Sequence, residues 1–174
     1  MSERDYPDAP AGPFPRPPAT VTDRDGRQIR VRVATDDDVE PLVEMYLGFN
    51  PEDRAQGIPP VRENGIRDWL ETLFGEDCLN VVALDGDAYV GHATLVPDVD
   101  GTYELAIFVV REYQGAGIGT TLLEHLFGHA QAEGVERVWL TVERWNDPAI
   151  ALYRKVGFEM SSSESFELEM AIHL

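Results

Sequence analysis

Three glycines fall at alternate positions in the stretch Gln114-Gly115-Ala116-Gly117-Ile118-Gly119. This stretch separates a β-rich run, 105–110, from an amphipathic run, 120–130. A glycine-rich turn that ends a strand and opens a helix directs several backbone N–H groups at one spot, where the positive end of the helix dipole attracts phosphate. We therefore predict a phosphorylated ligand here, against the plainer alternative that the glycines serve a tight turn and close packing.

Hydrophobic periodicity predicts the elements on both sides of this turn. Alternating apolar residues indicate half-buried strands, and apolar residues three and four positions apart indicate amphipathic helices. We predict strands at 29–33, 80–84, 88–96, 102–110, 138–142, 158–160 and 165–172, and helices at 39–47, 66–74, 118–130 and 148–156. The order β-α-α-β-β-β-α-β-α-β-β is a mixed α/β arrangement.

The length of 174 residues and the hydrophobic content of 43% suit one globular domain. Residues 1–28 hold six of the twelve prolines and little apolar periodicity, so we expect a loose, flexible tail before a domain at 29–174. The N-terminal stretch lacks the apolar block of a signal peptide, and no run of about 18 apolar residues is present. We therefore expect a cytoplasmic protein.

The charge balance is strongly acidic, with 32 acidic and 14 basic residues and a formal net charge of −18. Nucleic acids and anionic membranes bind basic surfaces, so neither is expected as a partner. All basic residues except Lys155 are arginine. We hypothesise a halophilic protein of a salt-rich cytosol, where screening relieves the self-repulsion; an ordinary acidic protein is the alternative.

A second characteristic stretch begins 27 residues after the glycine turn, Asn146-Asp147-Pro148-Ala149-Ile150-Ala151-Leu152-Tyr153-Arg154-Lys155-Val156-Gly157-Phe158. Together with 109–119 it closely resembles the two signature segments of the GCN5-related N-acetyltransferase (GNAT) superfamily. The resemblance implies a central, mostly antiparallel sheet of six to seven strands that splays between the fourth and fifth, 102–110 and 138–142, with four helices.

The same resemblance implies acetyl-CoA as the donor. Its pyrophosphate would bind the backbone of 114–120, and its pantetheine arm would run between the splayed strands, where amides can pair with a strand edge. A bulge at 108–110 would present a backbone N–H to the thioester carbonyl. Arg111, where relatives often have proline, would add positive charge beside the phosphates. The implied cofactor-binding residues are Phe108, Val109, Val110, Gln114, Gly115, Ala116, Gly117, Ile118, Gly119, Thr120 and Asn146.

Tyr153 matches the family tyrosine that protonates the departing thiolate of coenzyme A. A phenol with a pKa of about 10 is a suitable acid for a thiolate whose pKa is about 8.5 to 10. The alternative for Tyr153 is a place in the apolar stripe of the 148–156 helix. Likewise, Asn146 contacts the cofactor in the family, whereas turn chemistry before Asp147-Pro148 would explain it without a ligand.

The general base is predicted to be Glu104, because it starts the strand that leads to the thioester, and an ammonium must lose a proton before its nitrogen attacks. Glu143 is the second candidate, on one face with Thr141. Relatives that acetylate protein N-termini have a glutamate where this chain has Thr141, which argues against close kinship with them. A solvated surface carboxylate is the alternative for either glutamate.

The remaining reactive side chains give no metal site. His125 and His129 are four residues apart but lack the glutamate of the zinc hydrolase motif and a third ligand. Cys78 stands alone and is expected to be a small buried residue, and His92 is expected to be structural. We predict no metal.

We therefore predict an acetyl-CoA-dependent N-acetyltransferase in which a primary amine attacks the thioester directly through a tetrahedral intermediate. The acceptor, a small molecule or a peptide, would be selected by 48–60 and 161–165, which in this superfamily usually determine specificity. The alternative is a non-catalytic module that binds or senses acyl-CoA. A homodimer is left open.

Overall fold

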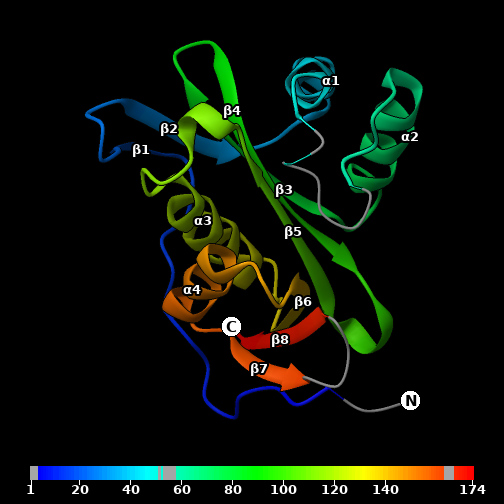
Figure 1. Ribbon diagram of the computed structural model, residues 1–174. Coiled ribbons are helices and arrows are strands. Elements are labelled where there is room, and N and C mark those ends of the chain that lie inside the picture. Colours follow the sequence, from blue (N-terminus) through cyan, green and yellow to red (C-terminus); the bar gives the residue numbers. More distant parts are fainter. Residues whose placement is uncertain (1–3, 51, 53–57, 163–166) are drawn as a thin grey trace.

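The computed structural model describes residues 4–174 except 51, 53–57 and 163–166. Within them the chain forms one eight-stranded sheet in the order β1-β2-β3-β4-β5-β6-β8-β7 (Figure 1). The strands are β1 Ala19–Thr22, β2 Gln28–Val33, β3 Leu79–Asp85, β4 Ala88–Pro97, β5 Tyr103–Val109, β6 Arg137–Glu143, β7 Glu159–Ser162 and β8 Glu167–His173. The helices are α1 Val39–Leu47, α2 Glu63–Leu73, α3 Ile118–Ala132 and α4 Asp147–Val156. No helix in these residues is long and apolar enough to cross a membrane.

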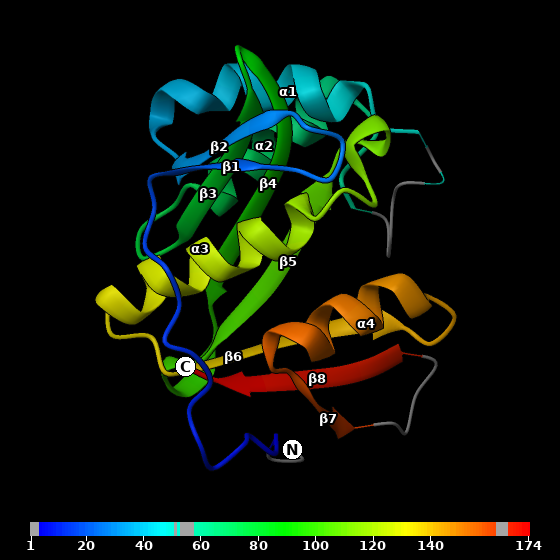
Figure 2. The ribbon, with the colours of Figure 1, turned by 90° about the vertical axis from the view of Figure 1, so that its left-hand side faces the viewer.

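The sheet opens between β5 and β6. These two strands are parallel and pair only at Tyr103↔Val138 and Glu104↔Trp139, whereas the other neighbours run antiparallel. Beyond this short contact the strands diverge (Figure 2). The predicted splay is therefore confirmed, and the described sheet has one strand more than the six to seven expected, because β1 extends it.

The N-terminal segment accounts for that extra strand. Residues 4–28 were expected to be a loose tail, but β1 pairs with β2 and the segment before it crosses α3 (Figure 2). The Ala11 N–H donates to the His173 carbonyl at 2.7 Å, and the Phe14 ring meets the Phe127 ring edge-on at 5.4 Å. A Cβ at Gly128 would lie 1.9 Å from the Pro15 carbonyl oxygen, so only glycine admits the segment there. Proline-rich composition predicted the lack of helix but not this packing.

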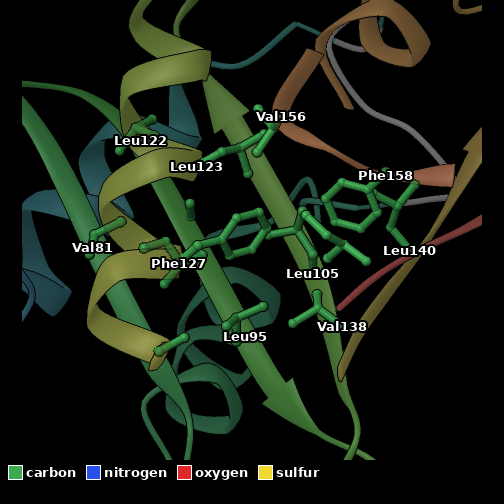
Figure 3. Packing of buried hydrophobic residues seen from close by; sticks show 14 of the residues in the cluster. Val81, Leu95, Leu105, Leu122, Leu123, Phe127, Val138, Leu140, Val156 and Phe158 are labelled. Carbon is green, nitrogen blue, oxygen red and sulfur yellow. The ribbon is translucent and has the colours of Figure 1, made fainter. Parts of the chain in front are cut away.

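Helices cover both faces of the sheet. The larger hydrophobic cluster lies under α3 and α4 and includes Leu105 of β5 together with Leu123 and Phe127 of α3 (Figure 3). The smaller cluster lies under α1 and α2 and includes Phe108 of β5. Successive β5 residues therefore face opposite sides, and burial of each large side chain contributes about 1.5–3 kcal/mol. β5 belongs to both cores, which fixes it at the edge of the splay.

Candidate active site

A cavity of about 750 Å³ lies where β5 and β6 diverge. Its walls include Ile107 and Val109 from the α3–α4 face and Ala106 and Phe108 from the α1–α2 face. The cavity therefore reaches both faces of the sheet. One ligand can enter from each face, and the two can meet beside β5.

The glycine turn forms the end of the cavity on the α3 side. Gly115 and Gly117 adopt left-handed backbone angles, with φ of 75° and 93°, and a Cβ at either would meet no atom within 4 Å. Gly117 is the N-cap of α3, and the first N–H bonded back to it is that of Thr121, at 3.2 Å. The N–H groups of the first three helical residues, 118–120, therefore have no carbonyl partner in the helix and can bind an anion.

Gly119 has a different role from the other two glycines. A Cβ there would lie 3.2 Å from Leu152 Cδ2, so its small size lets α3 approach α4. The alternative of close packing thus applies to Gly119, whereas Gly115 and Gly117 have open space where a ligand could approach the backbone.

Most of the predicted cofactor residues line one cavity, namely Phe108, Val109, Gln114, Gly115, Gly117, Gly119, Thr120 and Asn146. The other three predicted cofactor residues are not part of the cavity lining. Ala116 and Ile118 are buried in the core, and Val110 packs in the cluster under α1 and α2. Any contact of Ala116 or Ile118 with a ligand must therefore use the backbone.

The bulge expected at 108–110 is absent from the described pairing of β5 with β4. The register runs without a shift from Pro97↔Tyr103 to Gly91↔Val109, and the Val110 N–H donates to the Val90 carbonyl at 2.9 Å. Because alternate residues of an antiparallel strand direct their N–H groups to opposite edges, the Val109 N–H faces the gap toward β6. Plain strand alternation thus supplies a gap-facing donor. Gln114 Nε2 donates to the Val109 carbonyl at 3.0 Å, which ties the glycine turn to this position.

Tyr153 projects from α4 and lines the cavity. Its ring packs against Phe158 at 5.7 Å, and burial raises the pKa of the phenol to about 12. The hydroxyl therefore keeps its proton at neutral pH. Asn146 also lines the cavity, while its Oδ1 accepts the Ala149 N–H at 3.3 Å as the N-cap of α4. For Asn146 the turn role is present whether or not a ligand binds.

The two candidate bases lie at opposite ends of the splay, and both line the cavity. Glu104 stands where β5 still pairs with β6, whereas Glu143 is the last residue of β6. Glu104 is an exposed residue, yet desolvation of its carboxyl and the nearby Asp98 charge raise its pKa, against an opposing effect of Arg4. A raised pKa brings the group closer to the neutral range in which a base works.

Positive charge at the glycine turn comes from Arg24 rather than Arg111. Arg111 pairs with Glu52 at 2.9 Å and is not among the cavity residues. Arg24, in the turn between β1 and β2, lines the cavity beside Gly115. Arg24 lies 90 residues before the turn, in a segment expected to be a tail, so the local pattern around the glycines could not identify it.

His92 is fully buried and outside the cavity lining. Asn80 Nδ2 donates to the Leu73 carbonyl at 2.8 Å, so Asn80 Oδ1 accepts from His92 Nε2 at 2.7 Å. His92 Nδ1 then accepts the Tyr46 hydroxyl at 2.6 Å. Burial lowers the pKa of His92 to about 3, so the ring is neutral, in keeping with the structural role expected of it.

The other candidate metal ligands lie apart. His125 Nδ1 lies 2.7 Å from the Thr121 carbonyl oxygen on its own helix, and Cys78 is half-buried with a pKa raised by desolvation. In the part of the chain that the structure describes, no three His, Cys, Asp or Glu side chains are grouped to hold a metal ion.

A splayed sheet with a glycine-capped helix beside the gap is the architecture of an acetyltransferase fold, and the comparison with family models agrees. The acetyltransferase (GNAT) family matches residues 39–158. The chain belongs to this family and is an N-acetyltransferase.

Individual relatives support the same assignment. The [ribosomal protein bS18]-alanine N-acetyltransferase of Escherichia coli K12 is 32% identical over 119 residues, which cover 66% of this chain and 74% of the relative. By its name this relative acetylates an alanine of a protein, so the similarity does not support the expectation from Thr141 that the chain is distant from enzymes of that kind. The GNAT domain of S. lividans PAT has a TM-score of 0.77 at 23% identity, over 90% of this chain and 97% of that one. A phosphinothricin acetyltransferase from Sinorhizobium meliloti, solved in complex with AcCoA, has a TM-score of 0.70 at 25% identity, over 84% and 88%.

Proposed function

We propose that this protein transfers the acetyl group of acetyl-CoA to a primary amine by direct attack of the amine nitrogen on the thioester carbon. One observation carries the proposal: a single cavity joins the glycine turn on one face of the sheet to an apolar wall on the other, with Tyr153 and Glu104 in its lining. Donor and acceptor can therefore approach β5 from opposite sides.

The residues present suit coenzyme A. The N–H groups of 118–120 and the positive end of α3 would hold the pyrophosphate. The gap-facing edge of β5 offers backbone groups to the amides of the pantetheine arm. Acetyl-CoA supplies an activated acyl group; the protein binds and orients it.

Three groups of the chain would promote the transfer. Glu104, directly or through water, accepts the proton that the ammonium must lose. The Val109 N–H would donate to the acyl oxygen as negative charge develops on it; removal of a comparable donor costs about 3 kcal/mol. After the C–N bond forms, the nitrogen releases its second proton to water; as the C–S bond then breaks, Tyr153 gives its proton to the sulfur, and a proton from water restores the phenol.

The acceptor side has an apolar wall, formed by Trp69 and Leu73 of α2, Val96 of β4, and Ala106 and Phe108 of β5. Such a wall favours an amine that carries an apolar group, in a small molecule or at a peptide end. Of the segments predicted to select the acceptor, Asp53, Arg54 and Gln56 lie outside the described residues. The E. coli relative acts, by its name, on an alanine of a ribosomal protein.

A thiol-release assay with acetyl-CoA and a panel of amines, at low and at molar KCl, tests the proposal. Apolar primary amines should stimulate release of coenzyme A, and polar amines of equal basicity should do so less. If calorimetry shows binding of acetyl-CoA but no amine stimulates thiol release, the alternative of a binding or sensing module stands instead.

A further inference from the structure

The turn between β1 and β2 docks directly on the glycine turn. The Arg24 N–H donates to the Ala116 carbonyl at 3.0 Å, and Arg24 Nη1 donates to the Gly115 carbonyl at 3.3 Å. In the same turn, the Arg27 guanidinium lies 4.1 Å from the centre of the Tyr113 ring. Two segments about 90 residues apart in sequence therefore form one surface at the cavity mouth.

Asp23 fixes the shape of this turn. Its buried carboxylate accepts the N–H groups of Asp25 at 3.0 Å and Arg27 at 2.8 Å through Oδ1. Its Oδ2 accepts Arg27 Nε at 2.7 Å. Arg27 is thus used within the turn and on Tyr113, whereas Arg24 is exposed and directed toward the glycine turn.

The charges around the cavity distinguish Arg24 from its neighbours. The charged side chains among the described lining residues are Arg24, Glu104, Glu143 and Lys155. Of these four, Arg24 is hydrogen-bonded to the glycine turn, and Arg111 is paired with Glu52. In a chain with a formal net charge of −18, a cation at this point offsets a field that repels anions.

We propose that Arg24 binds a phosphate group of coenzyme A, and that the β1–β2 turn is thereby part of the cofactor site. This rests on the proposed function, since the ligand is its donor. A guanidinium has five N–H donors, so the bond to Gly115 leaves donors for phosphate oxygens. The N-terminal segment then serves binding as well as packing.

The test is calorimetry with coenzyme A, its 3′-dephospho form and pantetheine, on wild type, Arg24→Gln and Arg30→Gln. Arg30 is exposed on β2, away from the cavity lining, so Arg30→Gln matches the change in net charge. Arg24→Gln keeps the backbone N–H that docks the turn. We expect it to weaken binding of coenzyme A about tenfold, since a hydrogen bond to a charged group is lost. Arg30→Gln should change binding less than about twofold, as expected for a distant exposed charge.

The other ligands locate the contact. Pantetheine, which has no phosphate, should bind wild type and Arg24→Gln equally. A loss that persists with 3′-dephospho-coenzyme A assigns Arg24 to the pyrophosphate, and a loss that disappears assigns it to the 3′-phosphate; both support the proposal. Equal affinities of the two variants for coenzyme A, or an equal loss with pantetheine, would overturn it. Failure of wild type to bind coenzyme A would overturn the proposed function as well, and is a separate result.

Discussion

The two ends of the cavity are built from different parts of the chain. The glycine-turn end is made of backbone from one short stretch, in which Gly115 and Gly117 hold left-handed angles and 118–120 open α3. The opposite end is made of side chains from α2, β4 and β5, such as Trp69, Val96 and Phe108. A backbone site tolerates few residue types at its glycines, whereas a side-chain wall can change shape with each substitution. The first end is therefore suited to a constant ligand and the second to a variable one.

The largest effect on turnover is expected from a substitution of Tyr153, at the proposed junction between the two ends of the cavity. Removal of the hydroxyl in Tyr153→Phe takes away the proposed acid, so we expect turnover to fall about a hundredfold. Acetyl-CoA affinity should remain unchanged, because the ring and its packing on Phe158 are kept. Steady-state kinetics and calorimetry separate the two quantities.

Tyr103→Phe is the matched control, since Tyr103 is a half-buried tyrosine on β5 outside the cavity lining. Unchanged turnover in Tyr153→Phe would remove this residue from the mechanism and leave its place in the α4 stripe as its role.

Glu104→Gln tests which carboxylate serves the acceptor end. A base acts in its deprotonated form, so kcat/KM of wild type should fall as pH drops through the pKa of Glu104, which lies above the ordinary 4.5. The Gln variant should lose up to about a hundredfold in kcat/KM and lose that acid limb. pH–rate profiles of both proteins measure this.

Glu143→Gln makes the same charge change in the same cavity and should retain the acid limb. If the limb instead disappears in Glu143→Gln and persists in Glu104→Gln, the role passes to Glu143, and the proton is accepted at the open end of the splay.

A single added methyl group should weaken cofactor binding at the glycine-turn end of the cavity. In Gly117→Ala the added Cβ meets no protein atom, but the left-handed φ of 93° costs about 1–2 kcal/mol of stability and the methyl group crowds the phosphate site. We expect about a tenfold loss of acetyl-CoA affinity, equivalent to about 1.4 kcal/mol.

Gly134→Ala is matched to this change, because Gly134 has a φ of 84°, open space around its Cβ and no place in the cavity lining. It should lose similar stability in thermal unfolding but no affinity. Equal affinity losses in the two variants would mean that strain, rather than the position of the methyl group, weakens binding.

The difference between a site built from one contiguous stretch and a site built from distant segments also explains what could be predicted from the sequence. The glycine turn could be predicted because local backbone geometry is determined by neighbouring residues, whereas the splay and Tyr153 were implied by the resemblance of 109–119 and 146–158 to the GNAT signature segments. Arg24 could not be found in this way, because its position depends on β1 joining the sheet and on Asp23 shaping a turn. The bulge at 108–110 was wrong for a related reason: the β4–β5 register continues through Gly91↔Val109, and no local pattern reports a register.

Substitution of His92 should have the weakest effect, because this residue supports the acceptor wall and takes no part in the proposed reaction. The chain Tyr46–His92–Asn80 lies behind the acceptor wall, because the Tyr46 ring packs against Phe108 at 5.5 Å and Trp69 at 5.0 Å. In this hydrogen-bond pattern the ring is neutral, because Nδ1 accepts the Tyr46 hydroxyl; a protonated ring would donate at Nδ1 and deprive the buried Tyr46 hydroxyl of its acceptor. His92→Gln should therefore cost about 1 kcal/mol of unfolding free energy at neutral pH and leave acetyl-CoA affinity unchanged.

The pH dependence gives the sharper test. The pKa of His92 is about 6.5 when unfolded and about 3 when folded, so between these values the unfolded chain binds the extra proton. The stability that this residue contributes is full above about 6.5 and is lost as pH falls toward 3. Denaturant unfolding at pH 7 and pH 5 should thus show a smaller decline in His92→Gln than in wild type. An equal decline in both proteins would mean that His92 is protonated in the fold, and that the wall behind Phe108 is held by a different hydrogen-bond pattern.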